Sequence, residues 1–217
     1  MQTVLYPTGS AMAARGTDSG ESSVRPPAWR QVLPTLNIPG ATLRELRGSD
    51  ARSLFGLLTT VEVPRFISPP PATVEGFDRF IEWTQKKRAA GEYVCFGVIP
   101  DGYDSAVGLL QLQMPPGQPT EWGFALGSPF WGTGLFPASA AAVVDFAFTQ
   151  IGLSRLGARA MVDNHRGNGA LRKTGAVRGA LLPGASVGDG RAHDQYYWTL
   201  TLDDRPRRKI VWEGPRH

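Results

Sequence analysis

The sequence is poor in the side chains that hold metals or form disulfides. It contains a single cysteine, Cys95, so no disulfide can form within the chain. Its three histidines, His165, His193 and His217, are widely separated, which disfavours a zinc cluster, and we predict no metal site. So little cysteine fits a reduced, cytoplasmic setting.

Long apolar runs are also missing, because none reaches the roughly 20 residues that a membrane-spanning helix needs. The chain does not start with positive charge followed by an apolar block, so we expect no secretory signal and no membrane partner. With 41% hydrophobic and 19% charged residues, the composition is that of a globular protein. The 217 residues suffice for one domain with a substantial core, but not for two domains and a linker.

The net charge of +4 raises the question of a nucleic-acid partner. The densest basic groups are residues 86–88 and 205–209, each at the expected end of an element. Basic residues at a helix C-terminus complement the helix dipole, which explains the first group without a ligand. We therefore disfavour nucleic acid, and a phosphate-rich small molecule accounts for the charge equally well.

Composition and periodicity divide the chain into three parts. Residues 1–38 are rich in Gly, Ser, Ala and Pro and lack a lasting period, so we expect an extension that is flexible or partly docked. Residues 39–203 carry the periodic pattern of one domain, and residues 204–217 form a tail.

Within this domain we expect the order strand, helix, helix, three strands, helix, strand, helix and two strands. The strands are expected at residues 42–47, 93–99, 106–114, 121–126, 155–162, 176–182 and 195–202. Thr73 is the expected N-cap of the second helix, and Gly91 its end. Pro137 is expected to open the long third helix, which Gly152 ends, and a short helix through Ala170 ends at Gly175. The order predicts an α/β (α+β) fold with helices packed on a mixed sheet.

A glycine-rich segment, residues 131–136, precedes the long helix. Glycines let backbone N–H groups converge, and a helix N-terminus adds partial positive charge, so this segment suits a phosphate or pyrophosphate. It contains no Lys, which excludes a P-loop, and Pro137 stands where a dinucleotide fingerprint needs a small residue. Taken alone, the segment is equally compatible with a tight turn that binds nothing.

Read together with two other segments, this one resembles the GNAT superfamily. The three segments are Glu121-Trp122-Gly123-Phe124-Ala125-Leu126-Gly127, Trp131-Gly132-Thr133-Gly134, and Asn164 with Leu171-Arg172-Lys173-Thr174-Gly175. The resemblance is nearest to the Rim-type ribosomal-protein N-terminal acetyltransferases and covers residues 41–202. It implies a single GNAT domain whose mostly antiparallel sheet is splayed between the fourth and fifth expected strands.

The resemblance also implies acetyl-CoA as co-substrate and a primary amine as acceptor, either a protein N-terminus or a small molecule. Backbone amides of residues 132–136 would hold the pyrophosphate, residues 124–126 would pair with the pantetheine arm, and Asn164 would bind that arm from the other side. The implied cofactor contacts are Phe124, Ala125, Leu126, Gly132, Thr133, Gly134, Leu135, Phe136, Asn164 and Asn168.

For catalysis, the resemblance implies direct attack of a neutral amine on the thioester. Glu121 is our candidate for the base that removes the proton, and its alternative role is a surface carboxylate paired with an arginine. Trp83, off the main apolar stripe of its helix, is the candidate for the acceptor cleft, whereas Phe77 and Phe80 are expected in the core. Cys95 is expected to be a small buried side chain rather than a nucleophile.

One departure from the family pattern bears on activity. Gly167 stands where relatives often place a Ser or Tyr that protonates the departing thiolate, so Asn168 or a water would have to substitute. A positive φ angle at Gly167 and Gly169 would be one reason for glycine there. The missing hydroxyl motivates an alternative function, a non-enzymatic acyl-CoA sensor or scaffold. The acceptor's identity and a homodimeric state are left open.

Overall fold

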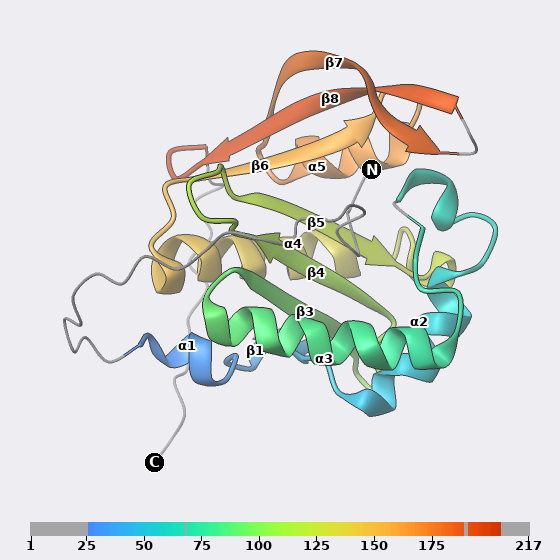
Figure 1. Ribbon diagram of the computed structural model, residues 1–217, viewed down its shortest axis with the longest axis vertical. Coiled ribbons are helices and arrows are strands. Elements are labelled where there is room, and N and C mark those ends of the chain that lie inside the picture. The colour runs from blue at the N-terminus through green and yellow to red at the C-terminus, as the bar shows by residue number, and fades with distance from the viewer. Residues whose placement is uncertain (1–25, 68, 189–190, 205–217) are drawn as a thin grey trace, which may run out of the picture.

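The computed structural model describes residues 26–67, 69–188 and 191–204, which form one eight-stranded sheet in the order β1-β2-β3-β4-β5-β6-β8-β7, flanked by helices (Figure 1). The strands are β1 (Leu36–Ile38), β2 (Ala41–Glu45), β3 (Tyr93–Pro100), β4 (Gly108–Gln113), β5 (Glu121–Leu126), β6 (Arg155–Met161), β7 (Val177–Gly188) and β8 (Arg191–Thr201). The helices are α1 (Ala28–Gln31), α2 (Ala51–Leu58), α3 (Val74–Ala90), α4 (Leu135–Phe146) and α5 (His165–Lys173). The predicted α/β class with a mixed, mostly antiparallel sheet is confirmed.

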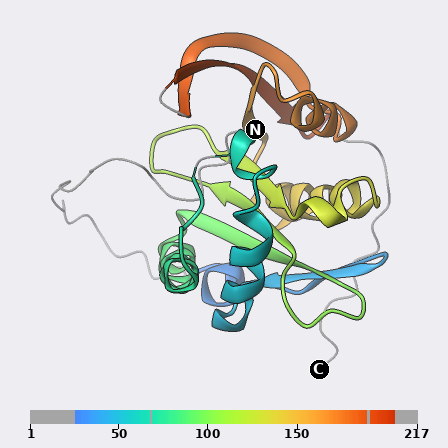
Figure 2. The same ribbon diagram turned by 90° about the vertical axis from the view of Figure 1, so that its right-hand side faces the viewer.

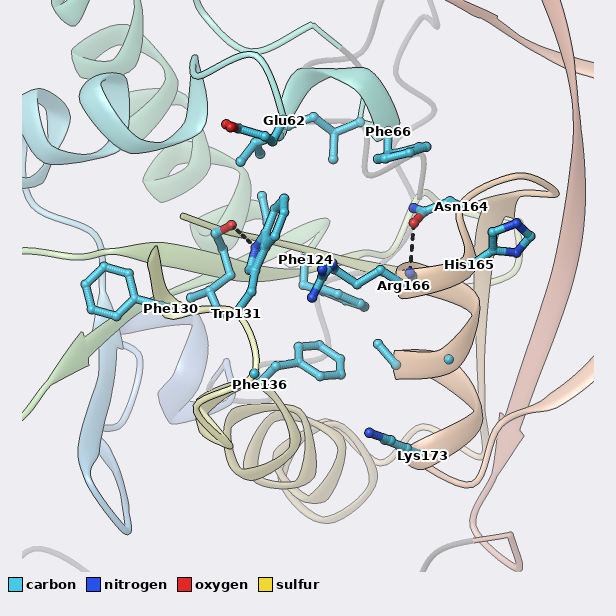
Figure 3. Close-up of a pocket in the computed structure, with 18 of the residues that line it drawn as sticks. Glu62, Phe66, Phe124, Phe130, Trp131, Phe136, Asn164, His165, Arg166 and Lys173 are labelled. Atoms are coloured by element: carbon cyan, nitrogen blue, oxygen red, sulfur yellow. Dashed lines mark hydrogen bonds between the residues drawn. The ribbon is translucent and has the colours of Figure 1, made fainter. Parts of the chain in front are cut away.

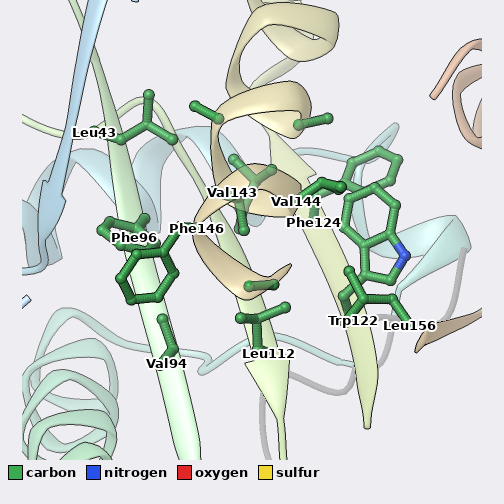
Figure 4. Close-up of a cluster of buried hydrophobic side chains, with 14 of the residues drawn as sticks. Leu43, Val94, Phe96, Leu112, Trp122, Phe124, Val143, Val144, Phe146 and Leu156 are labelled. Carbon is green, nitrogen blue, oxygen red and sulfur yellow. The ribbon is translucent and has the colours of Figure 1, made fainter. Parts of the chain in front are cut away.

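Helices cover both faces of the sheet, α2 and α3 one face and α4 the other (Figures 1 and 2). The core beneath α4 contains Phe96 and Phe146, whose rings meet edge to face at 5.2 Å, with Val143 and Leu112 beside them (Figure 4). The core beneath α2 and α3 includes Leu54, Phe77 and Phe80, and the last two are fully buried as predicted.

Helix α3 forms where its capping residues and apolar stripe predict it. The Thr73 side chain accepts a hydrogen bond from the Gly76 N–H at 3.0 Å, which satisfies one of the unpaired donors of the first turn. Gly91 ends the helix with φ +79°, a left-handed conformation that favours glycine. Both predicted ends of this helix are therefore confirmed.

The sheet is split between β5 and β6, its only parallel neighbours among the described strands. Their pairing is limited to Glu121 opposite Gly157, with the Gly157 N–H donating to the Thr120 carbonyl at 2.9 Å. Beyond this point the two strands separate toward their C-terminal ends. The predicted splay between these strands is confirmed, and it leaves a gap in the middle of an otherwise continuous sheet.

The start of α4 differs from the prediction, because this helix begins at Leu135 and Pro137 lies inside its first turn. Proline is tolerated there, since the N–H that it lacks would have no partner within the helix. Helix α5, whose end alone was predicted, begins at His165. Gly152 ends the π-helical turn that extends α4, with φ +82°.

At the N-terminal end of the domain part of the arm is docked, one of the two alternatives expected for it, and at the other end the last two strands are longer than expected. Residues 28–38 of the expected arm are docked, because Trp29 and Leu36 are buried and β1 pairs with β2. Strands β7 and β8 run into the loop expected around Gly188. Pro183 and Gly184 lie beyond the expected strand end at residue 182, at an irregularity of the edge strand β7 where both residues are tolerated. Residues 1–25 and 205–217 lie outside the described residues.

Candidate active site

A cavity of about 750 Å³ lies between the C-terminal end of β5 and α5, the helix that follows β6. Four segments line it: residues 62–67 after α2, residues 124–126 at the end of β5, residues 130–137 at the start of α4, and residues 164–173 of α5 (Figure 3). The last three segments are those that the sequence singled out. The fold therefore brings all three motifs to one place.

The glycine-rich segment gives the cavity an open backbone surface. Gly132 and Gly134 have φ angles of +79° and +87°, and a Cβ placed on either would meet no atom within 4 Å. The Thr133 hydroxyl donates to the Phe130 carbonyl at 2.9 Å and accepts from the Leu135 N–H at 3.4 Å. The amide of Leu135 is therefore already engaged by Thr133.

The neighbouring amides of Gly134 and Phe136 donate to no acceptor in the described part of the chain. They lie at the N-terminus of α4, where the helix dipole adds partial positive charge. Open backbone, converging N–H groups and a helix N-terminus together make a site for a phosphate group. The residues present thus fit the pyrophosphate of CoA.

Strand β5 directs alternate main-chain groups toward the gap. Because the Gly127 N–H bonds to the Val107 carbonyl on the β4 side, the alternation of an antiparallel ladder turns the main chain of Leu126 and Phe124 away from β4. The Leu126 carbonyl accepts a hydrogen bond from the Trp131 indole at 2.7 Å. The Phe124 ring packs against Phe136, with ring centroids 4.0 Å apart.

Asn164 is the N-cap of α5 and also lines the cavity. Its side chain is 4% exposed, and its Oδ1 accepts from the Gly167 N–H at 2.8 Å (Figure 3). The Nδ2 group donates to no acceptor among the residues described, so a donor is left for a ligand on the side of the gap opposite β5.

Gly167 is a glycine for a different reason from the one expected. Neither Gly167 nor Gly169 has a positive φ angle, because both lie within α5, so that explanation is wrong. A Cβ at Gly167 would lie 2.5 Å from Asn164 Nδ2. A larger residue at position 167 would force the capping side chain to move, which disfavours the hydroxyl-bearing residue that relatives often carry there.

Asn168 is engaged inside the protein. Its Nδ2 donates to the carbonyls of Met161 at 2.8 Å and Asn164 at 2.9 Å, and its Oδ1 accepts from the Trp198 indole at 2.9 Å. These bonds tie α5 to β6 and β8. Asn168 does not line the cavity, so its contact with the cofactor stays a prediction.

Glu121 is paired with an arginine at the point where β5 and β6 join. Its Oε1 accepts from Arg159 Nε at 2.9 Å and from Arg159 Nη2 at 2.8 Å, and its side chain is 31% exposed. Glu121 does not line the cavity, and its Oε2 takes no bond from any described residue. The pairing is the alternative that the sequence left open, and a role as base stays a prediction.

Trp83 and Cys95 belong to the packing between α3 and β3. The Trp83 ring lies 4.8 Å from Tyr93 and 6.3 Å from Phe80, outside the cavity lining, because β3 covers this flank of α3. A contact between Trp83 and the acceptor therefore stays a prediction that this cavity does not support. Burial, with a smaller effect from Glu45, raises the pKa of the Cys95 thiol, as suits a small buried side chain.

Sequence reasoning missed several charged residues of the cavity. Glu62 and Arg65 come from a proline-dense loop without a period, and Arg166, Arg172 and Lys173 come from α5. Phe136 and Lys173 lie toward one end of the cavity, Glu62 and Phe66 toward the other, and Arg166 and Trp131 lie between them (Figure 3). Two of these residues could have been found from the sequence, because Arg172 and Lys173 belong to a motif that was already assigned to the cofactor.

The described residues offer neither a metal site nor a membrane span. They contain no group of three or more His, Cys, Asp or Glu residues able to hold a metal ion. No helix in residues 26–67, 69–188 and 191–204 is long and apolar enough to cross a bilayer.

Comparison with known proteins agrees with the geometry of the cavity. The family described as acetyltransferase (GNAT) domain matches residues 41–177. The chain is 25% identical over 171 residues to the uncharacterized N-acetyltransferase p20 of Bacillus licheniformis, covering 77% of this chain and 96% of p20.

Solved structures share the fold at lower identity. RimJ of Mycobacterium smegmatis, in complex with CoA-disulfide, has a TM-score of 0.66 and 20% identity, covering 80% of this chain and 88% of RimJ. The ribosomal-protein-S5-alanine acetyltransferase of Vibrio fischeri has a TM-score of 0.68 and 16% identity, covering 80% of this chain and 99% of that enzyme. The Rim-type resemblance noted in the sequence is thus matched by structural neighbours.

Proposed function

We propose that this chain, which belongs to the acetyltransferase (GNAT) domain family, transfers the acetyl group of acetyl-CoA to a primary amine. One observation carries the proposal: the gap between β5 and β6 opens into a cavity bordered by the glycine-rich N-terminus of α4. The gap between the strands suits an extended arm, and the glycine-rich N-terminus of α4 suits a pyrophosphate.

In this proposal the cofactor contacts are divided among three walls. The amides of Gly132, Gly134 and Phe136 hold the pyrophosphate, and Lys173 lies toward the same end of the cavity as Phe136, with Arg172 also in the lining (Figure 3). The amide of Leu135 is satisfied by Thr133, so fewer donors serve the phosphate than residues 132–136 contain.

The pantetheine arm takes the gap itself. The main chain of Phe124 and the N–H of Leu126 face the arm on one side, and Asn164 Nδ2 offers a donor on the other. The co-substrate supplies the acetyl thioester. A relative of the same fold has been solved with CoA-disulfide, which supports a CoA site in this architecture.

The acceptor approaches from the face that carries residues 62–67. Val63 and Ile67 of this loop belong to the core beneath α2 and α3, as does Ala125. Glu121 lies on the same face of β5 as Ala125, because side chains alternate along a strand. Since its carboxylate does not line the cavity, we assign Glu121 the role of base acting through water.

In the transfer step the amine nitrogen forms a bond to the acetyl carbon, and the bond from carbon to sulfur breaks. The amine gives up a proton, and the CoA thiolate leaves and takes one from solvent. A thiol has an ordinary pKa of about 8.5, so a thiolate leaves without a strong acid beside it. The glycine at position 167 is compatible with this step.

Calorimetry of CoA binding tests the cofactor site. Gly134→Val would place a side chain where the phosphate approaches and should weaken binding at least about tenfold, the equivalent of one lost charge-assisted hydrogen bond. Gly102→Val is the matched control, because Gly102 has φ +82°, equally open surroundings and no place in the cavity lining. Equal CoA affinity in two folded variants would remove the phosphate site.

A further inference from the structure

Arg65 and Arg166 line the cavity without a carboxylate partner among the described residues. Arg65 comes from the loop after α2, and Arg166 comes from the first turn of α5. Neither guanidinium makes an ion pair or hydrogen bond within the described chain, and both side chains are exposed. By contrast, Arg44 pairs with Asp50 and Arg159 pairs with Glu121.

Each of the two guanidiniums lies over an aromatic ring. The Arg65 Cζ is 5.2 Å from the centre of the Phe66 ring, and the Arg166 Cζ is 4.6 Å from the Trp131 ring. The Trp131 ring is itself fixed by its bond to the Leu126 carbonyl. A guanidinium that rests on a ring keeps its N–H edge available, and that edge matches the two oxygens of a carboxylate. Both arginines are thus placed to receive an anion.

The position of these arginines separates them from the expected CoA phosphates. Figure 3 shows Lys173 and Phe136 at the end of the cavity next to α4, whereas Phe66, on which Arg65 rests, lies toward the opposite end. Arg166 lies between the two ends, beside Trp131. The phosphates have their own cations in Arg172 and Lys173, so Arg65 and Arg166 remain for the other substrate.

The surroundings restrict what that substrate is. Glu62 is the single carboxylate among the described residues that line the cavity, and it attracts a cationic amine. Apolar surface lies close by, from Phe66, Ile67 and Phe130. We propose that the acceptor is an amine whose apolar body also carries a carboxylate, which Arg65 and Arg166 bind; this specificity rests on the proposed function. A peptide N-terminus followed by acidic residues and a small aminocarboxylate both present this chemistry.

Pairs of acceptors that differ only in charge test the proposal. One pair is the peptide Ser-Glu-Glu-Ala amide and its counterpart Ser-Gln-Gln-Ala amide, and the other is 4-(aminomethyl)benzoate and 4-(aminomethyl)benzamide. The measured quantity is the ratio of kcat/KM for the acidic member to that for the neutral member. We expect a ratio of about 10 or more at low salt, falling as salt is added, because exposed charges are screened.

Substitutions assign the preference to the two arginines. Arg166→Met and Arg65→Met should each lower the ratio about tenfold. Arg166→Lys should lower it less than Arg166→Met, because lysine keeps the positive charge but lacks the planar pair of N–H donors of a guanidinium. Arg52→Met is the control, because Arg52 is exposed on α2 and absent from the cavity lining. Thermal melts and CoA titrations of each variant show that the fold and the cofactor site are intact.

A preference in the peptide pair alone supports the proposal with a protein N-terminus as acceptor, and one in the benzoate pair alone supports it with a small molecule. Equal rates within both pairs for the unmodified protein overturn the proposal while leaving amine acetylation in place. A loss of CoA affinity in Arg65→Met and Arg166→Met with an unchanged ratio also overturns it, because the arginines then serve the cofactor. Absence of thiol release with every amine contradicts the proposed function and this specificity together.

Discussion

Replacing Asn164 separates its structural role from its proposed role in binding CoA. The Asn164 Oδ1 caps α5 through the buried Gly167 N–H, whereas its Nδ2 is the proposed donor to the pantetheine arm. Asn164→Ala removes both groups and leaves that N–H without an acceptor, which should lower the free energy of unfolding by about 1–3 kcal/mol. In a domain of this size this loss lowers Tm by several degrees, about 2–4 °C per kcal/mol.

Asn164→Asp keeps the capping oxygen and replaces the donor by a second, negatively charged oxygen. Aspartate is as good an N-cap as asparagine and is favoured by the helix dipole, so Tm should change little at neutral pH. The lost hydrogen bond should weaken CoA binding by about 0.5–1.5 kcal/mol, or about 2–10-fold in Kd. Thermal melts and CoA titrations of the two variants measure both effects. Unchanged CoA affinity in Asn164→Asp would show that Asn164 serves only as a cap.

Further predictions concern three residues outside the cavity. Glu121→Gln should lower turnover about 10²-fold with CoA affinity preserved, and a loss below about threefold would leave Glu121 only its pairing with Arg159. Asp50→Asn should lower the free energy of unfolding, measured by urea titration, by about 3 kcal/mol or more, because the fully buried carboxylate accepts two hydrogen bonds from Arg44. An unchanged midpoint of the urea transition would refute this prediction. Burial opposes the ionisation of Asp50, but hydrogen bonds from Arg44 and from two backbone N–H groups outweigh burial and lower the pKa of Asp50. The ionised carboxylate should therefore stabilise the fold at pH values above the ordinary pKa of 3.8, and this stabilisation should be lost as the pH falls through the lowered pKa. Since burial raises the pKa of the Cys95 thiol, a thiol reagent at pH 8 should label Cys95 only after denaturation, and fast labelling of the folded protein would contradict its buried position.

The sequence predicted those parts of the fold that depend on local pattern. The ends of α3 follow from Thr73 and Gly91, and the strand at residues 121–126 follows from its apolar run and flanking turns. The gap beside that strand came from the family resemblance, because no local pattern shows where two strands separate. The strand expected to end at residue 182 continues through Pro183 and Gly184, because both residues are tolerated in an irregular edge strand.

The candidate site was less accessible to sequence reasoning because it joins distant segments. The loop at residues 62–67 has no period, and only the folded chain shows that it faces α5 across the cavity. Glu121 and Arg159 are 38 residues apart and meet only because β5 and β6 join at that point. The asparagines of α5 could be identified in the sequence, but their partners could not, since the bond from Trp198 to Asn168 requires β8 beside α5.

The most direct test of the central claim is a turnover measurement on the unmodified protein with acetyl-CoA and a panel of peptides and small amines. Free thiol should appear only when an amine is present, in equal amount to an acetylated amine identified by mass spectrometry. Gly134→Val should lose this activity and Gly102→Val should keep it, because both replace a glycine with positive φ but only Gly134 lines the cavity. Tight CoA binding without thiol release from any amine would contradict the account and would favour an acyl-CoA sensor.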